Sequence, residues 1–508
     1  MSFPHTAVAL CVATLGWLQA SPVAAAAEPA PLAVARRLAP PDMQAIGQGA
    51  RIKAALVQLS REHPDVQSAQ AAADTSSFEI DAARSARYPR LKVGTASGSY
   101  DSGVQGTGSR AYQLVTADLR MSLLDGGAMS ARVRAAEFGS EAGAEAVKST
   151  SQKVVLDALT AYLQVQRFDL KKQIARKSTE VLDELARAER RRIELGAAGE
   201  NDLRMATSRR AGIAAREMDF EAQRGEALAK FATFFRFTPD TAHLPVIAVP
   251  LQWQPASEAE ALLQAEDRSS ELAEARGRVQ RAQATVEQYE ASAWPTVDAV
   301  LVKTKDPRGV SPSEPTRAAL ELNWNFGNGF DRQVRVKAAI AEVANQEARL
   351  ESARQNLVEL TSASWARTAA GREREKQLRA AVTDSGLAFQ GRRRLLAFGR
   401  ETLPNVLDAQ VEYYTLLLDY VDAVFDLRVT ELRLQRTAGR LLVAPDSDNL
   451  WIDSLIAGAP RPVLTEESLL AAPCIARVRC EATAVSTVAT GSPVAGLALR
   501  RSARLGSL

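Results

Sequence analysis

A strand that leads directly into a very long helix is the feature that most constrains this sequence. From Val115 to Leu123 apolar and polar residues alternate, which is the period of a strand with one apolar and one polar face. Asp125-Gly126-Gly127 ends the alternation, and from Ala128 to Leu195 almost nothing interrupts a helix. At about 1.5 Å per residue, such a helix would be on the order of 100 Å long. A single globular core does not need that reach.

The same order of elements returns in the second half of the chain. Apolar and polar residues alternate from Leu320 to Phe326, Gly327-Asn328-Gly329 follows, and a long helical stretch begins. Leu119, Met121 and Leu123 align with Leu322, Trp324 and Phe326 at a constant offset. A tandem duplication explains this order. The predicted fold class is therefore α+β and mostly α, with two units that each contain a pair of strands and a long helical hairpin.

These patterns divide the chain into a leader, two repeats joined by a linker, and a tail. An apolar core followed by small residues with Ala-x-Ala frames predicts a signal peptide over residues 1–27. An irregular segment follows over 28–51, and the tail, 443–508, contains Cys474 and Cys480 and is expected to be largely mobile. The first repeat is predicted over 52–239, with one helix from 52 to 86, two strands within 91–125 and a helical hairpin over 128–235. A linker follows over 240–260. The second repeat is predicted over 261–442, with a helix, two strands within 296–327 and a helical hairpin over 330–442.

A membrane-crossing form of this chain would have to use its strands. Beyond the leader, no apolar run approaches the roughly 20 residues that a membrane-spanning helix needs. Four strands cannot close a barrel, and open strand edges are not tolerated in hydrocarbon. Three copies would supply twelve strands, an allowed number for an outer-membrane barrel. The prediction is a homotrimeric tube, in which a 12-stranded β-barrel is continued by a periplasmic α-helical barrel.

The junctions Leu124-Asp125-Gly126-Gly127 and Phe326-Gly327-Asn328-Gly329, each followed by a long helical hairpin, resemble the TolC family of outer-membrane channel proteins. The turn Arg192-Ile-Glu-Leu-Gly196 is similar to the family's hairpin tip, and the similarity covers nearly all of residues 52–442. The resemblance implies a trimeric duct in the outer membrane of a Gram-negative bacterium, surrounded by outer-membrane lipid. Such a duct joins a periplasmic adaptor and an inner-membrane transporter to the cell exterior.

The sequence is compatible with two kinds of cargo, each typical of a different branch of that family. Cys11 lies in the apolar core of the leader without the small residue expected before a lipidated cysteine. This favours the type I secretion branch, which works beside an ABC transporter and exports large repeat-type toxins such as adenylate cyclase-haemolysin. Small-molecule or drug efflux with a proton-driven pump is the alternative.

The resemblance also implies a constriction at the periplasmic mouth. Asn405-Val-Leu-Asp408-Ala409 is similar to the family's constriction, where two aspartates per protomer form rings, but Asn405 replaces the first of them. We therefore expect one ring of three carboxylates from Asp408, with raised pKa values and an affinity for polyvalent cations. The family's gate tyrosine and arginine correspond here to Leu396 and Glu401. The usual latch cannot be carried over, which leaves either a gate held by other contacts or a looser one.

Two further sets of charged residues are candidates for function. An acidic strip of helical spacing is either an acidic lumen lining or an ordinary solvated face; its members are Asp408, Glu412, Thr415, Asp419, Asp422 and Asp426. Arginine runs precede both hairpin turns and are either solvated or part of a docking surface for the adaptor, with Arg192, Gly196, Arg394 and Gly399 as its residues.

Other classes of function have little support. The formal net charge of +3 gives no strong case for a nucleic-acid partner. The histidines are scattered, and no phosphate loop, cysteine cluster or paired carboxylates predict an enzyme, a cofactor or a metal site. A periplasmic coiled-coil scaffold would explain the helices, but not two amphipathic strand pairs that each lead into one.

Overall fold

The computed structural model describes residues 47–100, 110–241, 244–307, 315–324, 331–444 and 449–457. The predicted signal peptide, most of the irregular segment 28–51, the second glycine turn at 327–329 and Cys474 and Cys480 lie outside these residues. Among the described helices, none combines the length and apolar composition of a membrane-spanning helix.

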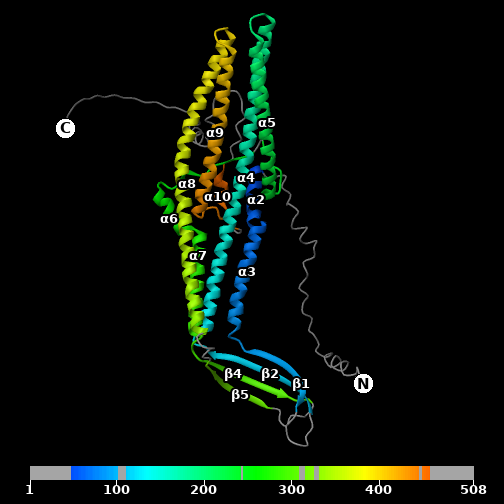
Figure 1. The fold of residues 1–508 in the computed structure, drawn as a ribbon, viewed down its shortest axis with the longest axis vertical. Helices are drawn as coiled ribbons and strands as arrows, with labels where there is room; N and C mark the ends of the chain where they lie inside the picture. The colour runs from blue at the N-terminus through cyan, green and yellow to red at the C-terminus, as the bar shows by residue number, and fades with distance from the viewer. Residues whose placement is uncertain are drawn as a thin grey trace, which may run out of the picture. The chain divides into compact units, whose positions relative to one another are not determined.

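The first repeat runs from two short helices through a strand pair into a hairpin of long helices (Figure 1). Asp125 initiates α4, because its carboxylate accepts hydrogen bonds from the Gly127 and Met129 amides at the helix N-terminus. The elements are α2 (Gln48–Glu62), α3 (Pro64–Ser85), β1 (Arg90–Tyr100), β2 (Arg110–Leu124), α4 (Ala128–Glu194) and α5 (Glu200–Phe235).

The single helix expected from 52 to 86 is wrong. The structure divides it at His63, where Pro64 occupies the first turn of α3 and the His63 side chain accepts a hydrogen bond from the Asp65 amide. Proline is compatible with the first turn of a helix but not with its interior. The dipeptide therefore ends α2 and starts α3.

The second repeat has the same order of elements, and α4 and α8 are both 67 residues long. The linker between the repeats holds β3 (Val246–Ile247) and a short 3₁₀ helix (Leu251–Trp253). It is followed by α6 (Glu258–Arg268), α7 (Ser270–Ala291), β4 (Thr296–Lys305), β5 (Thr316–Asn323), α8 (Asp331–Ala397), α9 (Leu403–Thr437), α10 (Leu450–Leu455) and β6 (Ile456–Ala457). The mostly helical fold with two tandem strand-pair and helical-hairpin units is confirmed.

The four longer strands form one antiparallel sheet in the order β1-β2-β4-β5. Its register places Leu91, Leu119, Leu301 and Ala318 side by side across the sheet. The face that they share is apolar and uncovered, since Leu91 is 67% exposed and Leu320, on the same face, is 71% exposed. The opposite face carries a charged cluster beside Val300 and Val302, with Arg120 3.5 Å from Asp298 and 3.3 Å from Glu321.

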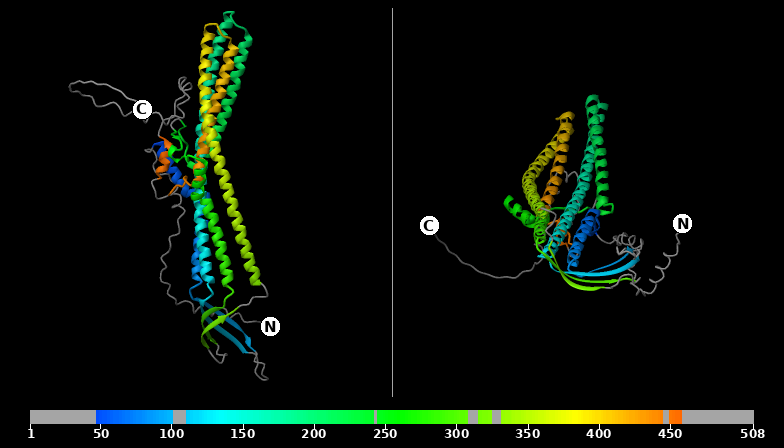
Figure 2. Two further views of the ribbon diagram at one scale, coloured as in Figure 1. Left: turned by 90° about the vertical axis from the view of Figure 1, so that its left-hand side faces the viewer. Right: turned by 60° about the horizontal axis from the view of Figure 1, so that its bottom comes forward.

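Helix α4 is the central element of the helical part. It packs against α3, α5, α7 and α9, while α8 packs against α7 and α9 (Figures 1 and 2). The main hydrophobic core lies between these helices, where Tyr162 and Phe231 are fully buried. The α4–α5 and α8–α9 turns lie at the end of the helices away from the sheet. At mid-height, β6 after α9 pairs with β3 of the linker, and Ile452 and Leu455 of α10 are buried in the main core.

Candidate functional site: the seam between the two helical hairpins

The acidic strip of α9 lies on one side of that helix. Asp408, Glu412, Thr415, Asp419 and Asp426 are exposed and Asp422 is partly buried, whereas the residues between them are mostly buried. The strip runs along the seam where α9 meets α4 and α5 of the other hairpin. Contacts across this seam decide whether the two hairpins stay together.

Two cations from α4 bind the strip at the middle of the seam. Arg167 lies 2.7 Å from Asp422 and 2.9 Å from Asp426, and Lys171 Nζ lies 2.6 Å from Asp422. The Lys171 side chain is only 11% exposed, so little water reaches its ammonium group. A shallow groove beside them is lined by Thr160, Leu163, Gln164, Arg167, Phe425, Asp426, Val429, Thr430 and Arg433.

Nearer the turns, three more polar contacts cross the seam. Arg209 of α5 donates to Asp408 at 2.6 Å, and Arg393 of α8 donates to Glu184 of α4 at 2.8 Å. Gln410 of α9 donates to Ser178 of α4 in a buried hydrogen bond. The expected aspartate of the constriction therefore has a guanidinium partner from the other hairpin.

The remaining residues predicted at the constriction do not meet Asp408 directly. Leu396 is partly buried and packs against the main core. Glu401 accepts a hydrogen bond from Asn405 Nδ2 at 2.7 Å. This bond, together with the Thr402 amide, lowers the pKa of Glu401 below its usual value. Glu401 therefore places a negative charge beside the first turn of α9, where the helix dipole favours it.

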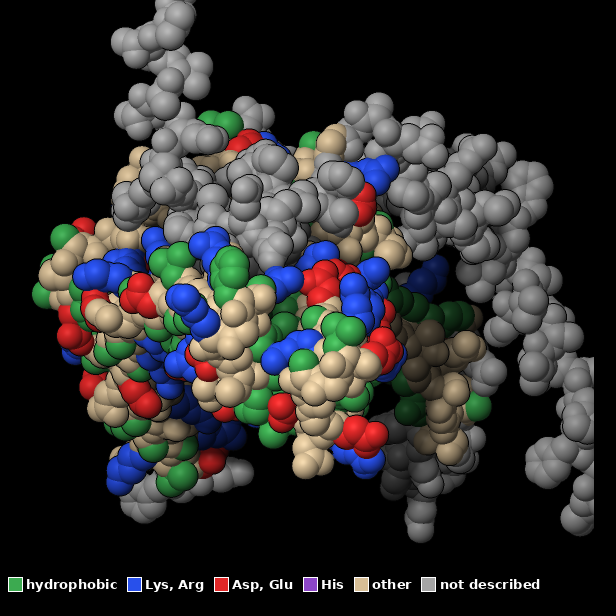
Figure 3. All heavy atoms as spheres, turned by 90° about the horizontal axis from the view of Figure 1, so that it is seen from above, with side chains coloured by type: hydrophobic (Ala, Val, Ile, Leu, Met, Phe, Trp, Pro, Cys, Tyr) green, Lys and Arg blue, Asp and Glu red, His purple; other side chains and the backbone are tan. Residues whose placement is uncertain are grey.

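Both predicted tips end in left-handed glycines. Gly196 has φ +72° and Gly399 has φ +69°, a conformation that favours glycine over other residues. Arg394 is exposed, whereas Arg192 donates to the buried carboxylate of Glu189 at 3.1 Å. Seen from the turn end, basic and acidic side chains are interspersed with apolar ones (Figure 3). Arg394 is therefore more available for an external contact than Arg192.

Ion pairs also hold α5 onto α4 within the first hairpin. Arg224 and Lys172 both bind Glu221, and they lower its pKa to about 2, with the Arg224 hydrogen bond as the largest cause. Glu221 is therefore ionised at any physiological pH. Ion pairs therefore stabilise the α4–α5 hairpin in addition to apolar packing.

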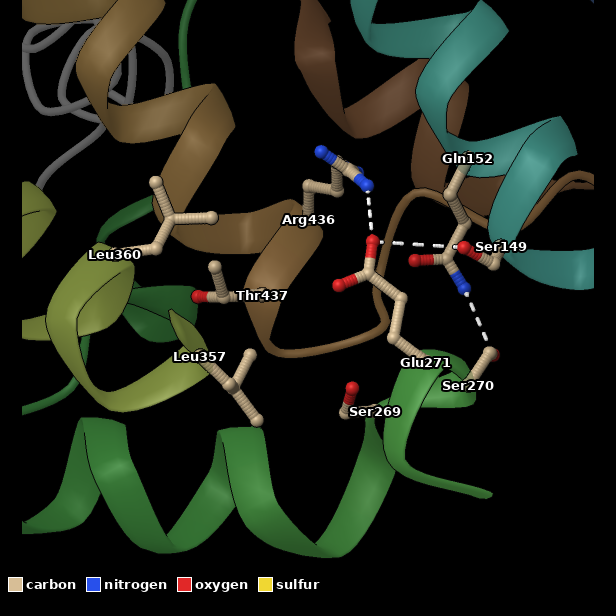
Figure 4. Close-up of a pocket in the computed structure, with 9 residues that line it drawn as sticks. All are labelled: Ser149, Gln152, Ser269, Ser270, Glu271, Leu357, Leu360, Arg436 and Thr437. Carbon is tan, nitrogen blue, oxygen red and sulfur yellow. Dashed lines mark hydrogen bonds and ion pairs between the residues drawn. The ribbon is translucent and has the colours of Figure 1, made fainter. Parts of the chain in front are cut away.

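A second polar cluster lies in a small pocket where α4, α7, α8 and α9 meet (Figure 4). Arg436 of α9 donates to Glu271, Ser149 donates to the same carboxylate at 3.5 Å, and Gln152 donates to Ser270 at 3.5 Å. These contacts join three helices at the first turn of α7. In the described part of the chain, no group of histidine, cysteine and carboxylate side chains could hold a metal ion.

The partners of the acidic strip were not among the predicted residues. Arg209 and Lys171 lie far along the chain from Asp408 and Asp422, the residues that they bind. The available signal was a polar stripe of α4, in which Asp157, Thr160, Gln164 and Arg167 recur at a spacing of three or four residues. Matching that stripe to the acidic strip would have required the relative heights of the two helices.

Comparison with known proteins agrees with this architecture. The outer membrane efflux protein family matches residues 55–234 and 261–440, which is more than half of the chain and both repeats. Protein CyaE of Bordetella pertussis is 28% identical over 292 residues, which cover 55% of this chain and 60% of that protein. The chain therefore matches less than two thirds of the length of this curated relative.

Solved outer-membrane channels share the fold. The outer membrane protein VceC from Vibrio cholerae superposes with a TM-score of 0.67 at 15% identity, over 76% of this chain and 95% of that structure. The open state of the MtrE outer membrane channel of Neisseria gonorrhoeae gives 0.65 at 16% identity, over 77% and 90%. The chain belongs to the outer membrane efflux protein family of TolC-type channels, and it lies in the outer membrane and extends into the periplasm.

Proposed function

We propose that three copies of this chain form an outer-membrane exit duct, which docks on a periplasmic adaptor and an inner-membrane ABC transporter and exports a large protein. The main support for this proposal comes from the four-stranded sheet. Its apolar face is uncovered, its polar face carries Arg120 and its carboxylate partners, and β1 and β5 leave both edges unpaired among the described strands.

Closure by two further copies satisfies each of these features. The β5 edge of one copy pairs with the β1 edge of the next, so that twelve strands close a barrel and every backbone group is hydrogen-bonded. The apolar face then contacts lipid, and the polar face lines the lumen. The continuous helices extend the same tube below the membrane, with the α9 strip directed inward.

The site residues take their proposed roles from this arrangement. Asp408, with Asn405, Leu396 and Glu401 around the α8–α9 turn, lies at the periplasmic constriction. Between this constriction and the sheet, the lumen is lined by Glu412, Asp419, Asp422 and Asp426. The turns at Gly196 and Gly399, with Arg192 and Arg394, receive the adaptor, and Arg394 is the more exposed of the two arginines.

The ion pairs across the seam act as the latch of the closed state. Arg209–Asp408 and Arg393–Glu184 join the hairpins close to the turns, at positions where Leu396 and Glu401 cannot supply the family's usual contacts. Separation of α8 and α9 from the first hairpin breaks both pairs and widens the periplasmic mouth. The latch is therefore ionic and reversible.

Protein cargo is supported by the sequence of the leader, where Cys11 lacks the setting of a lipidated cysteine. The second candidate is small-molecule efflux with a proton-driven pump, which the description of the matching family favours. Both candidates use the same duct, because the inner-membrane partner selects the cargo.

Deletion of the gene, with complementation by the full chain, distinguishes the two candidates. The proteins in the culture supernatant and the susceptibility to a panel of toxic small molecules would be compared in one strain. Loss of one large secreted protein with unchanged susceptibility supports protein export. Increased susceptibility with an unchanged supernatant supports efflux and refutes the protein cargo, and no change in either measurement contradicts both.

A further inference from the structure

The charge at the constriction depends on a residue of the other hairpin. Asp408 is 64% exposed on the acidic strip, and Arg209 Nη2 lies 2.6 Å from Asp408 Oδ1. The Arg209 side chain is 27% exposed, so its guanidinium is less hydrated than the Asp408 carboxylate that it binds. Each carboxylate of the expected ring thus has a positive charge in direct contact.

The other charges around the turn follow the same pattern. Arg392 lowers the pKa of Glu401 by its charge, in addition to the hydrogen bonds already described, and its guanidinium donates to the Asn405 carbonyl at 3.4 Å. Arg393 is bound to Glu184. Asp408, Glu401 and Glu184 therefore each have a basic neighbour. Glu412, one helical turn from Asp408 toward the sheet, is the nearest carboxylate of the strip without an ion pair among the described residues.

We propose that Arg209 compensates the charge of Asp408, so that the throat of the channel does not bind polyvalent cations as a ring of bare carboxylates would. This inference rests on the proposed trimeric channel and deepens its constriction. A trivalent cation in a ring of three free carboxylates gains the attraction of three charges at once. Three bound guanidinium groups cancel that field at close range as long as the Arg209–Asp408 pairs are intact.

Single-channel conductance of the full chain in planar lipid bilayers tests the proposal, with hexaamminecobalt(III) added on the periplasmic side. Arg209→Gln removes the compensating charge and keeps a polar side chain of similar reach. We expect the half-blocking concentration to fall by about tenfold or more, since unscreened carboxylates attract a trivalent ion strongly. Adding Asp408→Asn to Arg209→Gln should restore the weak block of the unmodified channel.

Arg210→Gln is the matched control, because Arg210 is the next residue of α5 and binds Asp183 within its own hairpin. It should leave the block unchanged. The charge compensation would be refuted if the unmodified channel were blocked as strongly as the Arg209→Gln variant and the block were lost in Asp408→Asn. The proposed channel would be unaffected by that result. Absence of conductance in every variant would instead refute the proposed channel, and this inference with it.

Discussion

Replacing Asp422 by asparagine tests the ionic contact at the middle of the seam. The Asp422 carboxylate accepts hydrogen bonds from Arg167 Nε and Lys171 Nζ, both at 2.7 Å. Asparagine has nearly the same shape but no charge, so Lys171 loses its counter-charge in a place where little water reaches it. Arg167 retains a second carboxylate, that of Asp426.

The expected size of the effect follows from burial. The Lys171, Asp422 and Arg167 side chains are 11%, 23% and 25% exposed. An exposed ion pair contributes about 0.2–1 kcal/mol, whereas removing one partner of a fully buried pair costs about 3–5 kcal/mol. This site lies between these limits, and the retained Asp426 contact lowers the cost. We therefore expect Asp422→Asn to reduce the free energy of unfolding by about 2 kcal/mol per protomer.

A double-mutant cycle with Lys171→Met, followed by denaturant unfolding in detergent, isolates the contact. The two changes should be coupled by about 1–2 kcal/mol, because the second removes the charge that the first leaves unpaired. Asp419→Asn is the control, since Asp419 is exposed on the same strip without an ion pair in the described part of the chain; it should change stability by less than about 0.5 kcal/mol. Equal costs for the two asparagine variants, or strict additivity with Lys171→Met, would refute the reasoning.

Three other changes test the latch, the first hairpin and the strand-to-helix junction. Arg393→Glu should raise the open probability of the reconstituted channel by about fivefold, equivalent to roughly 1 kcal/mol. The double variant Arg393→Glu with Glu184→Arg restores the ion pair with its charges exchanged and should return the open probability to its original value. A double variant whose channel stays open would contradict the latch. Because the pKa of Glu221 is lowered to about 2 by its cationic neighbours, its contribution to stability is present above pH 4.5 and is lost as the pH falls toward 2. Glu221→Gln should therefore flatten the dependence of stability on pH in that window, and an unchanged slope would argue against this ion pair. Gly126→Ala should lower the melting temperature of the trimer more than Gly127→Ala does. Both glycines have a positive φ, but only at Gly126 would the added methyl group lie 2.6 Å from a neighbouring side chain. Equal decreases in melting temperature would exclude this steric cause.

Local patterns were sufficient to predict the elements themselves. The alternation from Val115 to Leu123 lies within β2, and the helix expected from Ala128 to Leu195 is observed from Ala128 to Glu194. Both signals are carried by neighbouring residues, as period-two alternation and an unbroken helical stretch. The break at Pro64 was also visible in the sequence, but its place in the first turn of a helix was not recognised.

Contacts between distant segments could not be predicted in the same way. The linker strand β3 pairs with β6 after α9, and Arg209 binds Asp408 across the seam. Each contact depends on the relative height and rotation of long helices, which small changes in packing shift along the axis. A sequence pattern shows which side of α9 is polar, but not which cation of the other hairpin lies opposite each carboxylate.

Single-particle cryo-electron microscopy of the full chain, extracted from the outer membrane in detergent, is the decisive test of the trimeric duct. We expect a threefold axis, with β5 of each copy hydrogen-bonded to β1 of the next and with the α9 strip facing the lumen of a helical tube. A single copy with both sheet edges free, or an assembly in which the α9 strip faces the surrounding solvent outside the tube, would contradict it.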